Sequence, residues 1–148
     1  MARIWTAAAV GAALVLSGCG GGGGPGGGGA KGEAMKPCEA ANKETPKALS
    51  SAKSGRMTYG EAKLVADEAV QACEAAYSAW EKLNVGEACL EEADARRGFA
   101  WATRAALDHQ ISRPYKLRID REKDRIERAE DACKAAPAPG AEEAAKEG

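Results

Sequence analysis

Apolar and small residues recur at alternating steps of four and three along two stretches of the chain, which is the spacing of packed helices. The first stretch follows Thr58 and Glu61, which match a capping box, and ends at Gly86, a residue able to close a helix with positive φ. Its seam positions are Ala62, Ala66, Ala69, Cys73, Ala76, Trp80 and Leu83. The second seam consists of Tyr115, Ile119, Glu122, Ile126, Ala129, Cys133 and Ala136. Both stretches are therefore predicted to be helices packed along one face.

Two further helices are predicted from less regular patterns. Between about 87 and 111, apolar residues mark one stripe, but two positions of that stripe, Arg97 and Arg104, are charged. The apolar members are Leu90, Ala93, Ala100, Leu107 and Ile111. The most N-terminal helix carries Cys38, Ala41, Thr45, Ala48 and Ala52. It is interrupted by Pro46, where the helix is expected either to kink or to restart with Thr45 as its cap.

The spacing of the cysteines selects a disulfide pairing. After position 19 the cysteines are Cys38, Cys73, Cys89 and Cys133. Residues that face each other in an antiparallel hairpin have a constant sum of positions, so the midpoint of a bonded pair must lie in the connecting loop. The midpoint of 38 and 73 is 55.5 and that of 89 and 133 is 111, both at predicted helix breaks, whereas that of 73 and 89 is 81, inside a helix. The predicted pairs are Cys38–Cys73 and Cys89–Cys133; the alternative, a zinc site, lacks the CxxC pairs of zinc ribbons.

These patterns predict an all-α fold, a small bundle of about four helices over residues 36–136. The helices would form two antiparallel hairpins, each with one disulfide. The composition agrees, because phenylalanine occurs once and alanine supplies most of the apolar positions, which favours thin, close helix contacts. Residues 137–148, rich in proline, glycine, alanine and charge, are predicted to be a disordered tail.

The N-terminal residues have the pattern of an export signal. Arg3 precedes an apolar run over 4–16, which is shorter than the ~20 residues that span a bilayer. The segment Leu16-Ser17-Gly18-Cys19 resembles the bacterial lipobox. The resemblance implies a signal peptide over 1–18, cleavage after Gly18, a diacylglyceryl thioether on Cys19 and acylation, with palmitate for example, of the new amino group. The alternatives are an ordinary signal peptide with an accidental cysteine, or an uncleaved anchor.

The glycines that follow Cys19 fit this hypothesis. Residues 19–35 are predicted to be a flexible tether, since a glycine-rich chain behaves as a random coil. A phosphate-cradling loop would need a strand before it and a helix after it, and neither is predicted here. The expected location is the bacterial cell envelope, lipid-anchored and facing the periplasm or exterior. It is the outer membrane if the host has one, because Gly20 stands where an inner-membrane retention signal would have aspartate.

The charge balance gives no indication of nucleic-acid binding. The chain has 21 basic and 22 acidic residues, and loss of Arg3 with the signal peptide leaves 20 − 22 = −2. A nucleic-acid partner is therefore not predicted. The membrane, reached through the lipid anchor, is the expected partner.

Catalytic candidates are few. The single histidine, His109, has no recognisable nucleophile beside it, and nucleophilic catalysis requires a positioned pair. Glu91, Glu92 and Asp94 would serve as an acid pair only beside a cleft, which a thin helical bundle lacks. No catalytic residue, metal site or cofactor is predicted.

One pattern on the last helix points to binding. Its arginines step by three and four residues: Arg118, Arg121, Arg125 and Arg128. We call these four residues the arginine row. Guanidinium groups bind carboxylate and phosphate through two hydrogen bonds, so the row is a candidate site for an anionic envelope component or protein. The alternative is that these arginines pair with carboxylates of neighbouring helices. Trp80 is expected in the core and Trp101 on the surface, where it would be a second binding candidate.

Together these observations predict a non-catalytic, membrane-anchored envelope lipoprotein with a binding or structural role. The alternative function is a periplasmic inhibitor or immunity protein against a lytic enzyme, for which small disulfide-bonded domains are suited. An enzyme is the third and least supported class.

Overall fold

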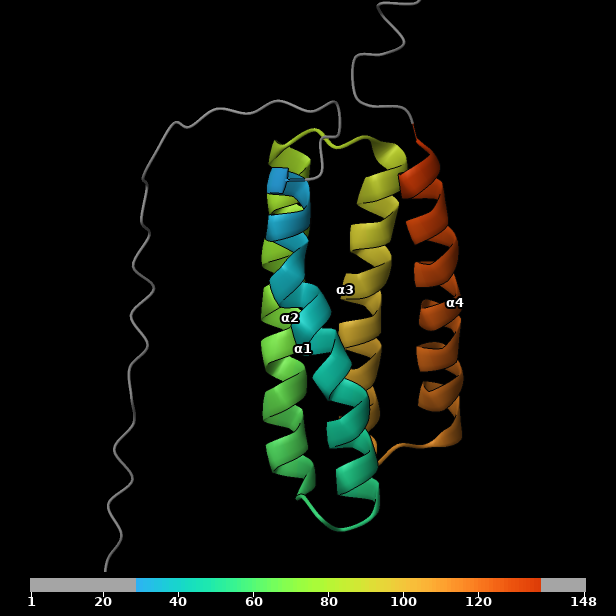
Figure 1. Cartoon of the computed structure of the whole chain (residues 1–148). Coiled ribbons are helices and arrows are strands. Elements are labelled where there is room, and N and C mark those ends of the chain that lie inside the picture. Colours follow the sequence, from blue (N-terminus) through green and yellow to red (C-terminus); the bar gives the residue numbers. More distant parts are fainter. Residues whose placement is uncertain (1–28, 137–148) are drawn as a thin grey trace, which may run out of the picture.

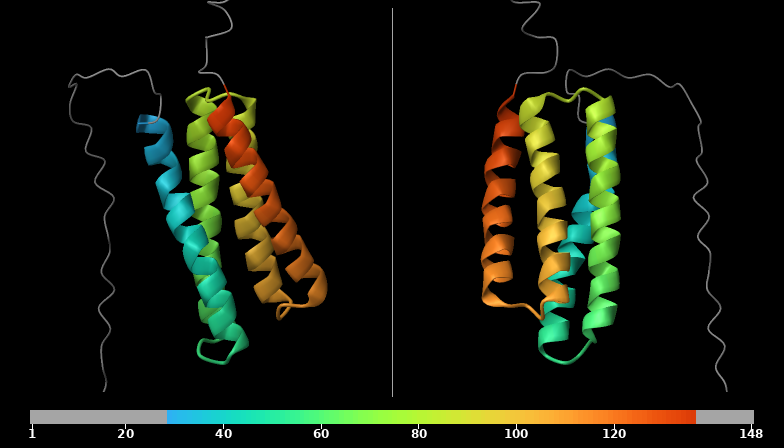
Figure 2. Two further views of the ribbon diagram at one scale, coloured as in Figure 1. Left: turned by 45° about the vertical axis from the view of Figure 1, so that its right-hand side comes forward. Right: turned by 180° about the vertical axis from the view of Figure 1, so that it is seen from behind.

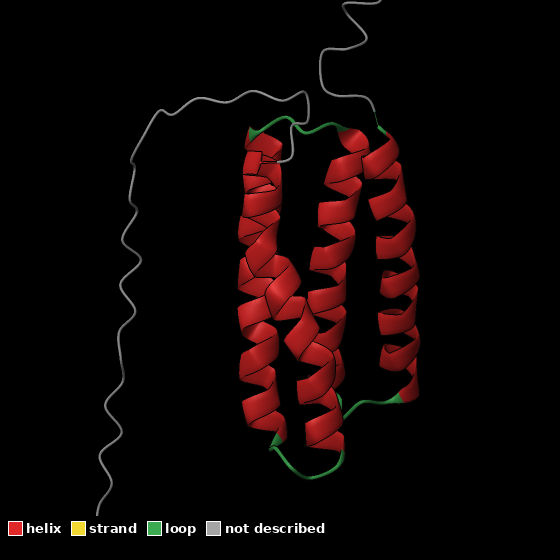
Figure 3. Ribbon diagram, viewed as in Figure 1, coloured by secondary structure: helices red, strands yellow, loops and turns green. Residues whose placement is uncertain are grey.

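The computed structural model describes residues 29–136, which form four helices and, within that range, no strand (Figures 1 and 3). The helices are α1 (Gly29–Lys53), α2 (Tyr59–Lys82), α3 (Glu87–Asp108) and α4 (Arg113–Ala135). The predicted all-α fold is confirmed. The predicted signal peptide, Cys19 and the tail lie outside the described residues.

The helices run alternately in opposite directions, so the two ends of the described chain lie at the same end of the bundle (Figure 1). Helices α2, α3 and α4 stand in a row, and α1 crosses α2 and α3 on one side (Figure 2). Among the four described helices, the backbone of α4 lies beside α3 alone, and only the backbone of α3 lies beside all the others. The arrangement is the predicted pair of antiparallel hairpins, α1 with α2 and α3 with α4.

The start of α2 follows from its sequence. The Thr58 hydroxyl accepts a hydrogen bond from the main-chain N–H of Glu61 at 3.1 Å, and the Glu61 carboxylate accepts one from the main-chain N–H of Thr58 at 2.8 Å. This is the predicted capping box, and it pairs two of the N–H groups that a helix start leaves free. The hydrogen bonds from Thr58 also lower the pKa of Glu61.

Helix α1 is longer than predicted. It begins at Gly29, seven residues before the expected boundary at position 36, and Met35 is buried with 2% exposure. The last residues of the predicted tether therefore belong to the folded domain. The helix also continues through Pro46 instead of restarting at Thr45. Pro46 has no N–H to bond the carbonyl of Asn42, and that carbonyl accepts the Thr45 hydroxyl at 3.1 Å instead.

The core is made largely of alanine. Twelve of the 23 buried apolar residues are alanines, and four more are the disulfide cysteines. Trp80, with 3% exposure, is in the core as predicted. Leu83 is not, because it caps the end of α2 and is 46% exposed. Ile111 also leaves the predicted seam, because α3 ends at Asp108 and Ile111 adopts φ 58° in the following turn.

Both predicted disulfides are present, Cys38–Cys73 joining α1 to α2 and Cys89–Cys133 joining α3 to α4. Each lies toward the end of its hairpin that is opposite the connecting loop. The loop at 83–86 has the predicted positive φ at Gly86, which is 91°. Within residues 29–136 no helix has the length and apolar character needed to cross a membrane.

Because alanines line the buried face of α2, we predict that the effect of a larger side chain on stability depends strongly on its position in this helix. Ala66 is fully buried, so Ala66→Leu is expected to overpack the core and lower the free energy of unfolding by about 1–3 kcal/mol. Ala75 is exposed on the same helix, and Ala75→Leu, the matched control, should change it by less than about 0.5 kcal/mol. Chemical denaturation of the two variants measures the difference. Equal effects would contradict close packing at this seam.

Candidate functional site

In the arginine row, Arg125 is partly buried and the other three arginines are exposed. The Arg125 side chain is 32% exposed and contacts two carboxylates of α3, with Nε 2.7 Å from Glu91 and Nη2 2.6 Å from Asp94. Hydrogen bonding to Glu91 and then to Asp94 raises the pKa of Arg125. Burial would raise the pKa of Asp94, but the hydrogen bonds from Arg125 and Arg97 lower it overall. Arg125 thus holds α4 to α3, as the pairing interpretation expected.

A third carboxylate of this cluster, Glu122, occupies a seam position of α4. Its side chain is 8% exposed, and one oxygen lies 3.4 Å from Nη1 of Arg125. Gly98 of α3 faces it, and a Cβ on Gly98 would lie 2.8 Å from the carboxylate. The absence of a side chain at Gly98 therefore provides the space in which Glu122 is buried.

The other three members of the row are exposed. The Arg121 side chain is 73% exposed, with its nearest carboxylate contact at 3.7 Å to Glu122. Within the described part of the chain, Arg118 and Arg128 form no ion pair within 4.0 Å. Arg118, Arg121 and Arg128 are therefore the part of the row whose guanidinium groups are available to an anionic partner.

A second arginine cluster was not identified from the sequence. Nη2 of Arg96 lies 3.3 Å from Glu39 of α1, 2.9 Å from Glu92 of α3 and 3.2 Å from Glu130 of α4. Hydrogen bonding to Lys134, with a smaller effect of Arg96, lowers the pKa of Glu130. The spacing of Glu92 and Arg96 was the only signal in the sequence, because the other two carboxylates come from distant helices. Arg96 thereby links three helices, including two whose backbones do not lie side by side.

The acidic residues and the histidine that were weighed as catalytic candidates do not lie together. Glu91 and Asp94 contact Arg125, whereas Glu92 contacts Arg96, so the three carboxylates serve two separate ion-pair clusters. His109 caps the end of α3 and stacks on Tyr115 with ring centroids 4.4 Å apart. Over residues 29–136, no group of three or more histidine, cysteine or acidic side chains is placed to hold a metal ion.

Trp101 is on the surface, as predicted. It is 44% exposed, and its indole N–H donates to Glu74 of α2 at 3.2 Å. The neighbouring arginines of α3 are occupied: Arg97 lies 4.2 Å over the ring of Tyr77, and Arg104 pairs with Asp67 at 2.8 Å. Trp101 is thus an exposed aromatic side chain beside one ion pair and one cation–π contact that join α2 to α3.

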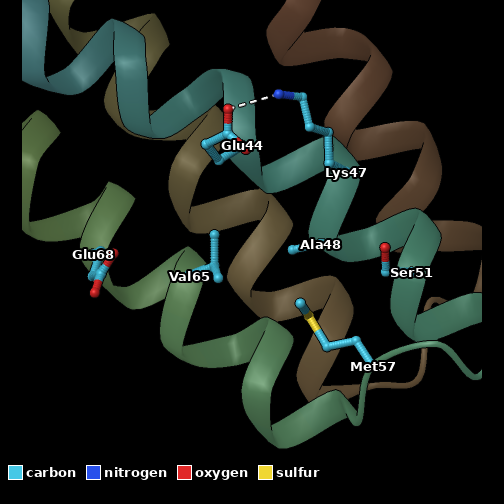
Figure 4. A pocket seen from close by; sticks show the side chains of 7 residues that line it. All are labelled: Glu44, Lys47, Ala48, Ser51, Met57, Val65 and Glu68. Atoms are coloured by element: carbon cyan, nitrogen blue, oxygen red, sulfur yellow. Dashed lines mark hydrogen bonds and ion pairs between the residues drawn. The ribbon is translucent and has the colours of Figure 1, made fainter.

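A shallow hollow of about 270 Å³ lies between α1 and α2 near their connecting loop (Figure 4). It is lined by Glu44, Lys47, Ala48, Ser51, Met57, Val65 and Glu68. Glu44 and Lys47 pair with each other at 2.7 Å at its rim. The volume is below the ~300–1,000 Å³ of ordinary ligand sites, and the hollow has no set of polar groups directed at one point.

Comparison with known proteins adds no relative: no family model, no curated protein and no solved structure matches the chain.

The division of the arginine row predicts different effects of two substitutions in α4. Arg125→Gln removes the partner of three carboxylates, one of them buried, and should lower the free energy of unfolding by about 1–3 kcal/mol. Arg121→Gln, its matched control, should change it by less than about 0.5 kcal/mol, since exposed pairs contribute little. Thermal or urea denaturation of both variants measures this. A stable Arg125→Gln protein would show that the cluster does not hold α4 in place.

Proposed function

We propose that the protein is a lipid-anchored lipoprotein of the bacterial cell envelope, with a non-catalytic binding or structural role. The observation that carries the proposal is the pair of interhelix disulfides in a domain that follows a lipobox-like segment. Disulfides persist in oxidising compartments outside the cytoplasm, which is where a lipoprotein signal directs a chain.

The position of the chain ends supports the same proposal. Nine residues, eight glycines and one proline, separate Cys19 from Gly29. Even fully extended, the ten steps between those residues reach at most about 35 Å. Anchoring at Cys19 would therefore keep the end of the bundle that begins α1 near the bilayer.

The binding part of the proposal rests on Arg118, Arg121 and Arg128. Their guanidinium groups are exposed along one helix, and within residues 29–136 no carboxylate of another helix lies within 4.0 Å of them. An anionic envelope component, such as a lipid headgroup or a wall polymer, is the class of partner that they suit. The proposed role is non-catalytic because the acidic residues and the histidine described above are engaged in separate structural contacts.

Anchoring is tested at Cys19. Cys19→Ser is expected to abolish acylation, leave the precursor uncleaved after Gly18 and remove the lipid from the N-terminus. Ser17→Ala, the matched control, keeps a small residue in the lipobox and should be processed normally. Mass spectrometry of the N-terminal peptide and membrane fractionation measure both effects. A wild-type N-terminus without lipid would refute the anchoring proposal.

Anion binding is tested by replacing the three exposed arginines together. Arg118→Gln/Arg121→Gln/Arg128→Gln should weaken binding to anionic vesicles or cell-wall fragments about tenfold or more, since each basic side chain near an anionic surface contributes roughly 1 kcal/mol. The melting temperature should stay close to that of the parent protein. Parent binding should also fall steeply with added salt, because exposed charges are screened.

Two results would refute this binding role. One is equal binding by the parent and the triple variant. The other is parent binding that does not change with salt. In either case the proposal would be reduced to an anchored structural domain.

A further inference from the structure

The two disulfides have different surroundings. Lys31, in the first turn of α1, places its ammonium nitrogen in contact with Sγ of Cys89 and with Sγ of Cys133. The same turn is fixed to α2, because the main-chain carbonyl of Lys31 accepts the indole N–H of Trp80 at 2.9 Å. The ammonium group also lies 5.1 Å from the centre of the Trp80 ring. The beginning of α1 thus holds a positive charge against one disulfide.

The helix ends distinguish the two sulfur atoms of this bond. Cys89 lies in the first turn of α3, where the free N–H groups and the helix dipole stabilise negative charge. Cys133 lies in the last turn of α4, where the free carbonyl groups oppose it. Cys133 is also the more exposed of the two, at 6% against 2%. The first turn of α3 therefore favours Cys89 as the leaving thiolate, and Cys133 is the sulfur atom that the incoming thiolate attacks.

Cys38–Cys73 has none of these features. Both cysteines lie within helices, away from the ends, and both have 0% exposure. Its side-chain neighbour is the uncharged amide of Asn42, 3.7 Å from Sγ of Cys38. This bond is expected to be an inert structural crosslink and provides an internal reference.

We propose that Cys89–Cys133 is a site of thiol–disulfide exchange with a dithiol reductant, activated by Lys31. The thiolate of the dithiol forms a bond to Sγ of Cys133 while the Cys89–Cys133 bond breaks, and Cys89 leaves as a thiolate beside the Lys31 ammonium group. The second thiol of the reductant then loses its proton and attacks the reductant's own sulfur atom in the mixed disulfide, which releases Cys133 as a thiolate. The dithiol is thereby oxidised to a disulfide, its two electrons reside on the sulfur atoms of Cys89 and Cys133, and these thiolates take up the two protons that the reductant's thiols released.

Reduction of Cys89–Cys133 would remove a covalent attachment of α4. The backbone of that helix lies beside α3 alone among the described helices, and Cys89–Cys133 is its covalent link at the end that carries the chain termini. After reduction α4 is held at that end by non-covalent contacts, including the Arg96 cluster through Glu130. The exposed arginines lie on the same helix. The redox state of this bond would therefore alter how rigidly their positions are held relative to the rest of the bundle.

The experiment uses the full-length chain with Cys19→Ser, which removes the one cysteine outside the two disulfides. The protein is treated with dithiothreitol under native conditions, quenched by alkylation at intervals, and each cysteine pair is followed by mass spectrometry. Cys89–Cys133 is expected to be reduced about tenfold faster than Cys38–Cys73, or more. Lys31→Gln should slow the reduction of Cys89–Cys133 about fivefold and leave Cys38–Cys73 unchanged.

Two matched variants separate charge from position. Lys31→Arg keeps the positive charge and should retain a rate close to that of the parent. Lys36→Gln removes an exposed lysine of the same helix, paired with Glu33, and should have no effect. Equal reduction rates of the two disulfides in the parent would overturn the proposal, since they would mean that reduction follows global unfolding. A Lys31→Gln rate equal to the parent's would also overturn it.

Discussion

Close packing through alanine is the constraint on which this bundle depends. Alanine side chains allow helices to approach closely, but each contributes only one methyl group to the buried apolar surface, which stabilises in proportion to its area. The covalent links between helices compensate for this thin core. Each disulfide closes a long segment, with sequence separations of 35 and 44, and contributes about 4 kcal/mol in the chain-entropy model. The two bonds are thus comparable to a large part of a small domain's total stability.

Ion pairs add the contacts that alanine does not provide. Helix α3 is central: Arg96 pairs with carboxylates of α1 and α4, and Arg104 pairs with Asp67 of α2. Arg97 adds a cation–π contact with Tyr77 of α2. Arg125 of α4 pairs with Asp94 of α3 and also with the buried carboxylate of Glu122. A buried carboxylate without such a partner would be destabilising, so these guanidinium groups belong to the architecture. They are not available for binding.

The exposed arginines of α4 and the Cys89–Cys133 disulfide lie at different places on this bundle. The structural arginines leave Arg118, Arg121 and Arg128 exposed on a helix that is attached along one side only. The ammonium group of Lys31 lies against Cys89–Cys133, at the end of the bundle where α1 begins. Breaking that disulfide would affect the exposed arginines, because α4 contains both Cys133 and these arginines.

The sequence by itself determined what depends on local periodicity and on the geometry of hairpins. The capping box at Thr58, the two regular seams and the disulfide pairing follow from spacing alone, because antiparallel helices of equal rise bring fixed sums of positions together. Tertiary structure decided which arginine is structural and which is free, since the carboxylates that approach Arg96 and Arg125 come from other helices. It also decided that α1 begins at Gly29, where glycine has a poor helix propensity. There the packing of Met35 and the hydrogen bond from Trp80 to Lys31 outweigh that preference.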